Sequence, residues 1–121
     1  VTAELTGLPP GEHGFHIHEW GLCGDGGKAA GGHYNPSKSH HGMVIKDGLK
    51  NAHAGDMGNI IAGQDGKAVL EVVIAKIALT GAKRNVAGRA VILHEKADDF
   101  GQPAGNAGGR IACGVVAVTG Q

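Results

Sequence analysis

The chain has 121 residues and a formal net charge of zero, because 11 lysine and arginine residues balance 11 aspartate and glutamate residues. With no net charge and with its charges dispersed along the chain, neither nucleic acid nor a membrane is expected as a partner. Leucine, isoleucine, valine and phenylalanine total 27 residues, enough for one small core, and 23 glycines favour a loop-rich fold with tight turns.

Short stretches of alternating apolar and polar residues recur along the chain, and no segment shows a convincing helical period. The sequence therefore predicts six strands, at residues 1–8, 14–19, 56–62, 67–75, 86–94 and 111–118. In residues 67–75, alternate apolar side chains from Ala68 to Ile74 would face the core, while the charged side chains would face water. Residues 63–66, Gly-Gln-Asp-Gly, predict a hairpin turn before that strand.

Two segments, residues 20–55 and 95–110, show no clean periodicity. A loop as long as residues 20–55 inside a compact domain is usually either functional or disordered. This one contains His33, His41 and His53, so metal ligation would order it. The second loop is predicted to cover the other side of the same site.

Histidines are the most informative residues, since eight occur in 121 residues and histidine is the commonest metal ligand among side chains. In a strand at residues 14–19, His16 and His18 would point to one face while the residues between and before them pack on the other. Three or more imidazoles around one ion suit copper, zinc, iron or nickel, and an all-nitrogen site favours copper. Asp56, three residues after His53, adds a carboxylate that suits zinc. The sequence therefore predicts a metalloprotein.

The motifs around these histidines resemble those of the copper/zinc superoxide dismutase family. Residues 14–19 (GFHIHE) resemble its first signature, and residues 105–115 (GNAGGRIACGV) resemble its second. Four further segments follow the family's order and near-family spacing, namely residues 31–36 (GGHYNP), 41–42 (HG), 53–59 (HAGDMGN) and 94–99 (HEKADD). The resemblance covers essentially the whole chain.

This resemblance implies one domain over residues 1–121 with an all-β fold. The fold would be a Greek-key, immunoglobulin-like β-sandwich or flattened barrel with a long metal-binding loop. Family members usually carry about two more strands before the His-x-His strand, and an incomplete sheet exposes unpaired edge groups. Because only 13 residues precede Gly14, we expect the gap to be covered by self-association into a homo-oligomer, by strand exchange, or by a strand-complementing partner.

The resemblance also implies two metal sites that share one ligand. Copper would be bound by His16, His18, His33 and His94. Zinc would be bound by His33, His41, His53 and Asp56. His33 would bridge the two metals through a deprotonated ring, which two adjacent dications make possible. His40 competes with His41 as a zinc ligand, and the spacing from His33 favours His41.

Two residues resemble family positions that support the ligands. Asp98 resembles the carboxylate that holds one copper histidine and one zinc histidine, here His16 and His41, and such partners fix ring orientation and basicity. His13 resembles a supporting residue for which hydrogen bonding is the expected role.

The activity implied is dismutation of superoxide to oxygen and hydrogen peroxide by a one-electron copper cycle, with zinc holding the bridging histidine. His33 would deliver a proton, and Arg110 would hold the superoxide anion by charge-assisted hydrogen bonds. For Lys96, guidance of the anion and an ordinary solvated side chain both stay open.

Two other classes of function stay open beside the dismutase. One is a dismutase-like copper-delivery or scaffolding domain without turnover, and the other is a metal-storage or zinc-only module. The presence of all four copper histidines argues against the first, and Arg110, for which storage has no need, argues against the second.

Cys23 and Cys113 match the family's disulfide pair, which would link the metal-binding loop to the last strand. On the chain-entropy model, closing a loop of about 90 residues contributes roughly 4–5 kcal/mol. A disulfide favours an oxidising compartment. The short spacing from His18 to Cys23 resembles the secreted bacterial branch of the family, so a periplasmic or extracellular location is expected over a cytoplasmic one.

Overall fold

The computed structural model describes residues 1–81 and 83–120. Helix in this part of the chain is limited to the 3-10 turn η1 (Lys28–Ala30) and the short helix α1 (Val44–Asp47). The strands are β1 (Thr2–Leu5), β2 (Gly11–His18), β3 (Asp56–Ala62), β4 (Ala68–Glu71), β5 (Ala90–His94) and β6 (Arg110–Val115).

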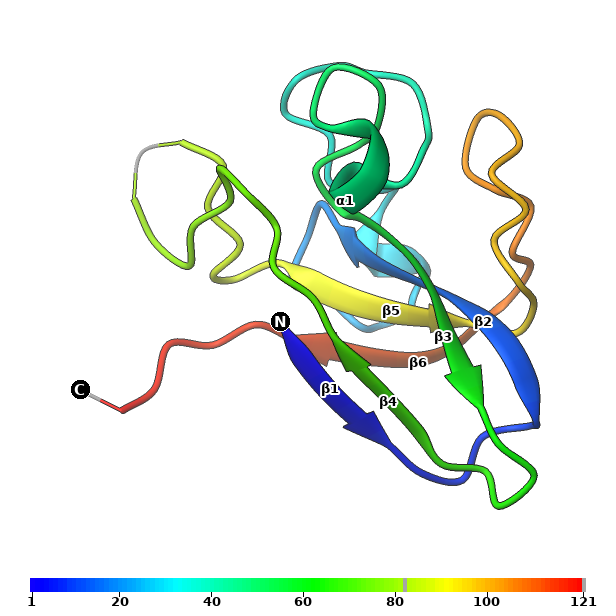
Figure 1. The fold of residues 1–121 in the computed structure, drawn as a ribbon. Coiled ribbons are helices and arrows are strands. Elements are labelled where there is room, and N and C mark those ends of the chain that lie inside the picture. The colour runs from blue at the N-terminus through cyan, green and yellow to red at the C-terminus, as the bar shows by residue number, and fades with distance from the viewer. Residues whose placement is uncertain (82, 121) are drawn as a thin grey trace.

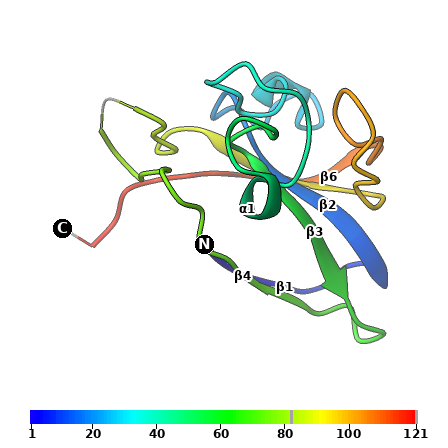
Figure 2. The same ribbon diagram turned by 45° about the horizontal axis from the view of Figure 1, so that its top comes forward.

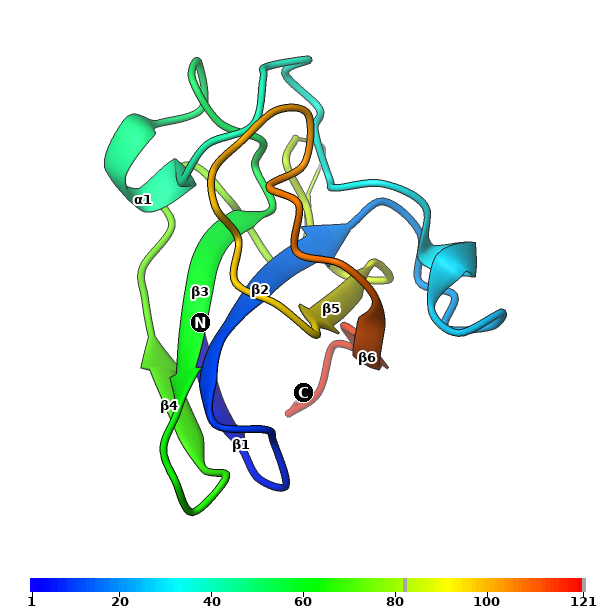
Figure 3. The ribbon, with the colours of Figure 1, turned by 90° about the vertical axis from the view of Figure 1, so that its right-hand side faces the viewer.

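The strands form two antiparallel sheets (Figure 1). β1 pairs with β4, and the larger sheet has the order β3-β2-β5-β6. Figure 3 shows the larger sheet curving from β3 to β6, with β4 beside β3. The predicted all-β fold class is confirmed, and the two sheets with non-sequential strand order agree with a Greek-key β-sandwich.

Each predicted strand has a counterpart in the structure, but only residues 56–62 keep both predicted ends, and the ends of the other five differ. β1 and β6 cover Thr2–Leu5 and Arg110–Val115 instead of residues 1–8 and 111–118. β2 begins at Gly11, three residues before the predicted start, where Gly11 pairs with Ala62. β4 ends at Glu71, where its pairing with β1 ends. One further hydrogen bond, from the Val72 N–H to the Val1 carbonyl, follows this pairing. Residues 86–87 precede β5 rather than belong to it, because their N–H groups bond to the carbonyls of residues 78–79 within the preceding loop.

The predicted turn at residues 63–66 exists, but it does not make a hairpin. Gly66 donates its N–H to the Gly63 carbonyl at 3.0 Å and has a φ of 76°, a conformation that glycine adopts without steric cost. β3 continues into the turn as a partner of β2, whereas β4 leaves it as the partner of β1. The turn therefore carries the chain from one sheet to the other, and the hairpin prediction was wrong.

Both faces of β2 are buried from His13 to His18: one packs in the hydrophobic core, and the other carries histidines. Phe15 and Ile17 lie in the main hydrophobic core, where they join Met57 and Ile60 of β3 and Leu93 of β5. Full burial of such side chains contributes about 1.5–3 kcal/mol each. The histidines that alternate with Phe15 and Ile17 face the opposite side, so the alternation of a strand supplies a packed face and a ligand face together.

Two loops lie over that ligand face, one between β2 and β3 and one between β5 and β6 (Figures 1 and 2). Cys23 of the first loop forms a disulfide with Cys113 of β6, the pair that the family resemblance implies. No helix of the described residues is long and apolar enough to cross a membrane.

Candidate metal centre

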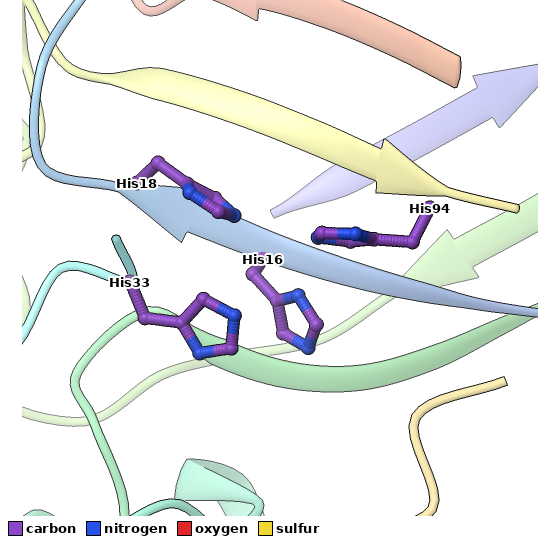
Figure 4. Close-up of side chains that lie close together, drawn as sticks. All are labelled: His16, His18, His33 and His94. Carbon is purple, nitrogen blue, oxygen red and sulfur yellow. The ribbon is translucent and has the colours of Figure 1, made fainter. Parts of the chain in front are cut away.

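Four histidines from three parts of the chain converge beside the larger sheet (Figure 4). β2 provides His16 and His18, the end of β5 provides His94, and the loop between β2 and β3 provides His33. An isolated bridge between His18 and His33 brings that loop against β2. One ring nitrogen from each of the four lies within 4.8 Å of the others, so the group could hold a metal ion.

The hydrogen bonds of these rings show which nitrogen is available. His16 Nε2 lies 2.8 Å from Asp98 Oδ2, and His18 Nδ1 lies 2.8 Å from the Gly31 carbonyl oxygen. His94 Nδ1 lies 3.3 Å from the Gly108 carbonyl oxygen. The other nitrogen of each ring is buried and has no hydrogen-bond partner. Buried polar atoms are almost always paired, so three such atoms facing one point indicate a cation site.

Burial also sets the charge of these rings. It lowers the pKa of His16 to about 4 and that of His18 to about 3, and it lowers the pKa of His94 as well. Desolvation disfavours the protonated, charged ring, so the rings are neutral at neutral pH. Neutral imidazole is the form that binds a metal, and no proton has to leave these three rings first.

A second group lies behind the first and consists of His33, His41, His53 and Asp56. Asp56 is its centre. Its Oδ1 lies 2.9 Å from His33 Nδ1 and 3.2 Å from His53 Nδ1, and its Oδ2 lies 2.9 Å from His41 Nδ1. The His41 Nδ1 atom nevertheless lacks hydrogen-bond geometry to any partner. Two atoms that are close but not aligned with each other are typical of ligands that point at a common third atom.

Charge differs between the two groups. Burial disfavours ionisation of Asp56, but its contacts with three histidines and the Gly42 N–H outweigh burial and hold its pKa far below the usual range. Burial likewise opposes the charged ring of His41, but Asp56 and Asp98 outweigh it and raise the pKa of His41 to about 9. Without metal, the second group is therefore an anion with protonated histidine beside it.

His33 belongs to both groups. Its Nδ1 faces Asp56 and lies 3.1 Å from His53 Nδ1. Its ring stacks against that of His16, with centroids 4.0 Å apart. The Nε2 atom is therefore the one that remains for the first group.

Asp98 also connects the two groups, through contacts with one ring of each. Its carboxylate contacts Nε2 of His16 and, at 2.8 and 2.9 Å, Nε2 of His41. Burial opposes ionisation here too, but both rings and the Phe100 N–H outweigh it and keep the pKa of Asp98 below its usual value. Asn59 fixes the backbone of Asp98 through two hydrogen bonds of 2.7 and 3.0 Å.

A cleft of about 280 Å³ opens over the first group. His18, His33, His94 and Arg110 are among the residues that line it. Arg110 donates from Nη1 to the Gly27 carbonyl at 2.8 Å, which fixes the guanidinium at the rim. Burial lowers the pKa of Arg110, but arginine stays charged in proteins. A small anion can therefore meet a fixed cation beside the histidines.

The remaining predicted residues lie outside the two groups. His13 lies 2.8 Å from the His94 carbonyl oxygen through Nδ1 and 2.7 Å from that of Pro9 through Nε2, which is a hydrogen-bonding role. His40 is exposed and belongs to neither group, whereas its neighbour His41 is buried in the second. Lys96 is exposed and does not line the cleft over the first group.

Comparison with known proteins identifies the family. The family model for copper/zinc superoxide dismutase matches residues 1–116. The chain belongs to this family. Among solved structures, a crystal structure of a protein described as the clock protein EA4 matches with a TM-score of 0.83 and 44% sequence identity, over 93% of this chain and 73% of that chain. The resemblance predicted from the motifs is thus confirmed.

The donor atoms of this dismutase-family chain fit the two metals that the family implies. Four imidazoles, three of them with a buried unpartnered nitrogen, form the all-nitrogen set that favours copper. Three imidazoles and one carboxylate form a four-ligand set that zinc accepts. The family and the geometry together support copper/zinc-type metal binding.

Sequence reasoning missed two residues that hold the centre together. Asn59 lies within residues 53–59, which resemble the family, but nothing in the local sequence predicts that it pairs with Asp98. Gln102 accepts from the His41 N–H and donates to the His41 carbonyl, both at 2.9 Å, across 61 residues of chain. Neither contact follows from spacing, because the first depends on how the loop between β5 and β6 meets β3, and the second on how that loop meets the loop between β2 and β3.

Proposed function

We propose that the chain, acting as a single domain of residues 1–121, is a superoxide dismutase that converts superoxide to oxygen and hydrogen peroxide. The observation that carries the proposal is the set of unpartnered nitrogens of His16, His18 and His94, which lie below a cleft rimmed by Arg110. A site that only stores metal needs no fixed cation beside an open cleft, whereas a site that acts on a small anion does.

In this proposal His16, His18, His33 and His94 hold copper, and His33, His41, His53 and Asp56 hold zinc. Copper supplies a one-electron couple when bound, and zinc, which has no redox chemistry, holds His33 and tunes its basicity. Asp98 orients one ring in each group, and His13 supports the end of β5 through the His94 carbonyl.

The residues of the chain then have separate tasks. Arg110 binds superoxide through charge-assisted hydrogen bonds and orients it in the cleft. Two superoxide ions and two protons give one oxygen and one hydrogen peroxide, so protons must reach the second superoxide as it is reduced. His33 Nε2 faces away from Asp56 and would carry one proton when it is not bound to metal, while water entering the cleft from solvent would supply the other.

The test is direct assay of superoxide consumption by the protein reconstituted with both metals. We expect turnover that requires copper and exceeds spontaneous dismutation at the same pH. Metal content is measured on the same sample, so that poor loading is separated from lack of activity. Full loading without superoxide-dependent turnover would remove the enzyme from the proposal and leave the metal-binding function.

The second candidate is a dismutase-like copper-delivery or metal-binding module without turnover. We keep this second candidate because the similar structure is described as a clock protein, a description that names no dismutase activity. The two candidates differ at Arg110. If the protein is an enzyme, replacing Arg110 lowers the rate of superoxide consumption while both metals stay bound. If it is a delivery module, there is no such rate for the replacement to lower.

We also propose that the chain forms a homo-oligomer or takes up a strand-complementing partner. β6 lies at an edge of the larger sheet, and its Ile111 and Val115 are 45% and 52% exposed. Sedimentation at micromolar concentration tests this, and a monodisperse monomer would count against it. The disulfide supports a periplasmic or extracellular location, which fractionation of the source cells tests.

A further inference from the structure

A cleft of about 440 Å³ lies where the loop between β2 and β3 meets the segment between β4 and β5, away from the metal-ligand groups. We refer to it as the basic cleft. Its lining residues are Ser37, Lys38, Ser39, His40, Leu49, Lys50, Lys76 and Arg84. Figure 2 shows the two loops that form it, in teal and yellow-green.

Charge is distributed unevenly around the basic cleft. Four of the chain's 11 lysine and arginine residues line it, whereas none of its 11 acidic residues does. Within residues 1–81 and 83–120, the ion pairs include none of these four side chains. A chain that is neutral overall thus carries a local positive field, and a concave surface with one sign of charge concentrates ions of the other sign.

Three of the four cationic residues that line the basic cleft also have an unusual backbone conformation. Lys38, Lys76 and Arg84 have φ values of 54°, 65° and 50°, in the left-handed region that side chains with a Cβ rarely adopt. They are three of the six non-glycine residues with positive φ in the described chain. Such conformations persist where the surrounding structure fixes them, and they cluster at binding sites. Here all three of these residues line the same cleft.

Two neighbouring clefts extend the positive surface. One of about 330 Å³ shares Ser37 and Arg84 with the basic cleft, and adds Lys83 together with Arg89, which pairs with Glu19 at 3.5 Å. Another, of about 510 Å³, shares Lys50 and Lys76 and adds Lys46, together with Asp47 as the one acidic lining residue of the three clefts. Cations on both sides suit a ligand with several separate negative groups better than a single small ion.

The basic cleft has few groups on which a nucleic acid base could stack. Its lining contains no aromatic side chain besides the imidazole of His40. Tyr34 lines the adjoining cleft, but it is 3% exposed, and the Arg89 guanidinium covers its ring at 3.8 Å from the centroid. Binding of single-stranded nucleic acid normally uses exposed rings for stacking. The Ser39 hydroxyl donates to the Leu49 carbonyl, so the Ser37 hydroxyl and the cations are the groups that suit oxyanions.

We propose that the basic cleft binds a small organic anion bearing several phosphate or sulfate groups. Lysine and arginine would contact separate oxyanion groups, since arginine binds such groups in a bidentate manner and lysine acts as a point charge. None of the cleft's lining residues belongs to either ligand group, so its occupancy does not require dismutase activity.

The test uses the metal-loaded protein and myo-inositol hexasulfate, because sulfate esters are weak ligands for copper and zinc. Calorimetry measures affinity for the wild type, for the variant Lys50→Gln/Lys76→Gln, and for Arg84→Gln. The matched control is Lys28→Gln/Lys67→Gln, which removes the same charge from two exposed lysines that line none of the three clefts. Backbone amide chemical shifts map the bound position.

We expect one saturable site whose shifts lie at residues 37–40, 49–50, 76 and 84. Affinity should fall about tenfold or more in the double cleft variant, change about twofold or less in the control, and weaken as salt rises. Inorganic sulfate should bind far more weakly than the hexasulfate, and a comparison with inositol hexakisphosphate, with metal content checked afterwards, separates sulfate from phosphate ligands. Equal losses in the cleft and control variants, shifts scattered over lysines elsewhere, or equally tight binding of single sulfate would overturn the proposal.

Discussion

The Nε2 atom of His16 lies 2.8 Å from Oδ2 of Asp98, although 82 residues separate them in the sequence. The same carboxylate contacts His41, so one side chain orients a ring in each ligand group. Replacement of Asp98 by asparagine removes the charge and one acceptor, and should lower metal affinity about 10–100-fold. Competition with a chelator measures this separately for copper and zinc.

The control for that variant is Asp99→Asn, in the neighbouring exposed residue that contacts Gly101 and Asn106. It should bind both metals as the wild type does. An unchanged affinity in Asp98→Asn would show that the contact between the two groups has no part in holding metal.

Arg110 offers the sharpest separation of turnover from metal binding. Arg110→Gln keeps a polar side chain at the rim but removes the charge, so the rate constant for superoxide should fall about tenfold, and its dependence on salt should weaken. Metal content should not change, because Arg110 belongs to neither ligand group. Lys67→Gln removes one charge from an exposed turn and serves as the control. Equal rates in both variants would contradict the role given to Arg110.

The bridging role of His33 can be tested spectroscopically. With cobalt in place of zinc, a shared ring should couple the two metal ions magnetically, and His33→Ala should abolish that coupling. Electron paramagnetic resonance of the copper ion measures the coupling. Its persistence in the variant, or its absence in the wild type at full loading, would show that the two groups do not share His33.

The strand alternation of β2 made much of the site predictable from sequence. His16 and His18 fall on one face of any strand that buries Phe15 and Ile17, so their proximity follows from a period of two. The sequence also predicted each strand's approximate position, because apolar alternation marks strands that have one solvated face. β4 and β5 are shorter than predicted, since the pairing of β4 with β1 ends at Glu71 and the N–H groups of residues 86–87 bond to carbonyls of the preceding loop.

Contacts between the two loops could not be predicted in the same way. The pairing of Asn59 in β3 with Asp98 depends on the path of aperiodic residues 95–110, and that of Gln102 with His41 depends on the paths of residues 95–110 and 20–55. The basic cleft is a similar case. Lys38, Lys50, Lys76 and Arg84 look dispersed along the chain, and only the fold brings their charges together.

The disulfide between Cys23 and Cys113 should dominate the stability of the described fold. It joins residues 90 apart, and loop closure of that length contributes roughly 4–5 kcal/mol. The double variant Cys23→Ser/Cys113→Ser should lose a comparable free energy of unfolding. Urea denaturation of the metal-loaded proteins measures it. A loss below about 1 kcal/mol would mean that the unlinked loop and β6 are held by other contacts.

Acid should destabilise the metal-free protein through the copper-side histidines. Burial lowers the pKa of His16 to about 4 and that of His18 to about 3, from an ordinary value of 6.5. As pH falls through 6.5, the unfolded chain takes up protons on these rings and the folded chain does not. The free energy of unfolding therefore falls by about 1.4 kcal/mol per pH unit for each ring until the folded pKa is reached.

His41 does not cancel this loss. Burial opposes its charge, but Asp56 and Asp98 raise the pKa of His41 to about 9, so its contribution is already nearly complete at pH 6.5 and is lost only as pH rises through 9. We therefore expect the metal-free protein to lose about 4 kcal/mol between about pH 7 and pH 5, by urea denaturation. The variant His16→Gln/His18→Gln lacks two of the three rings whose pKa burial lowers, so its dependence on pH should be flatter, with His94 remaining. An equally steep slope in this variant would place the acid sensitivity elsewhere.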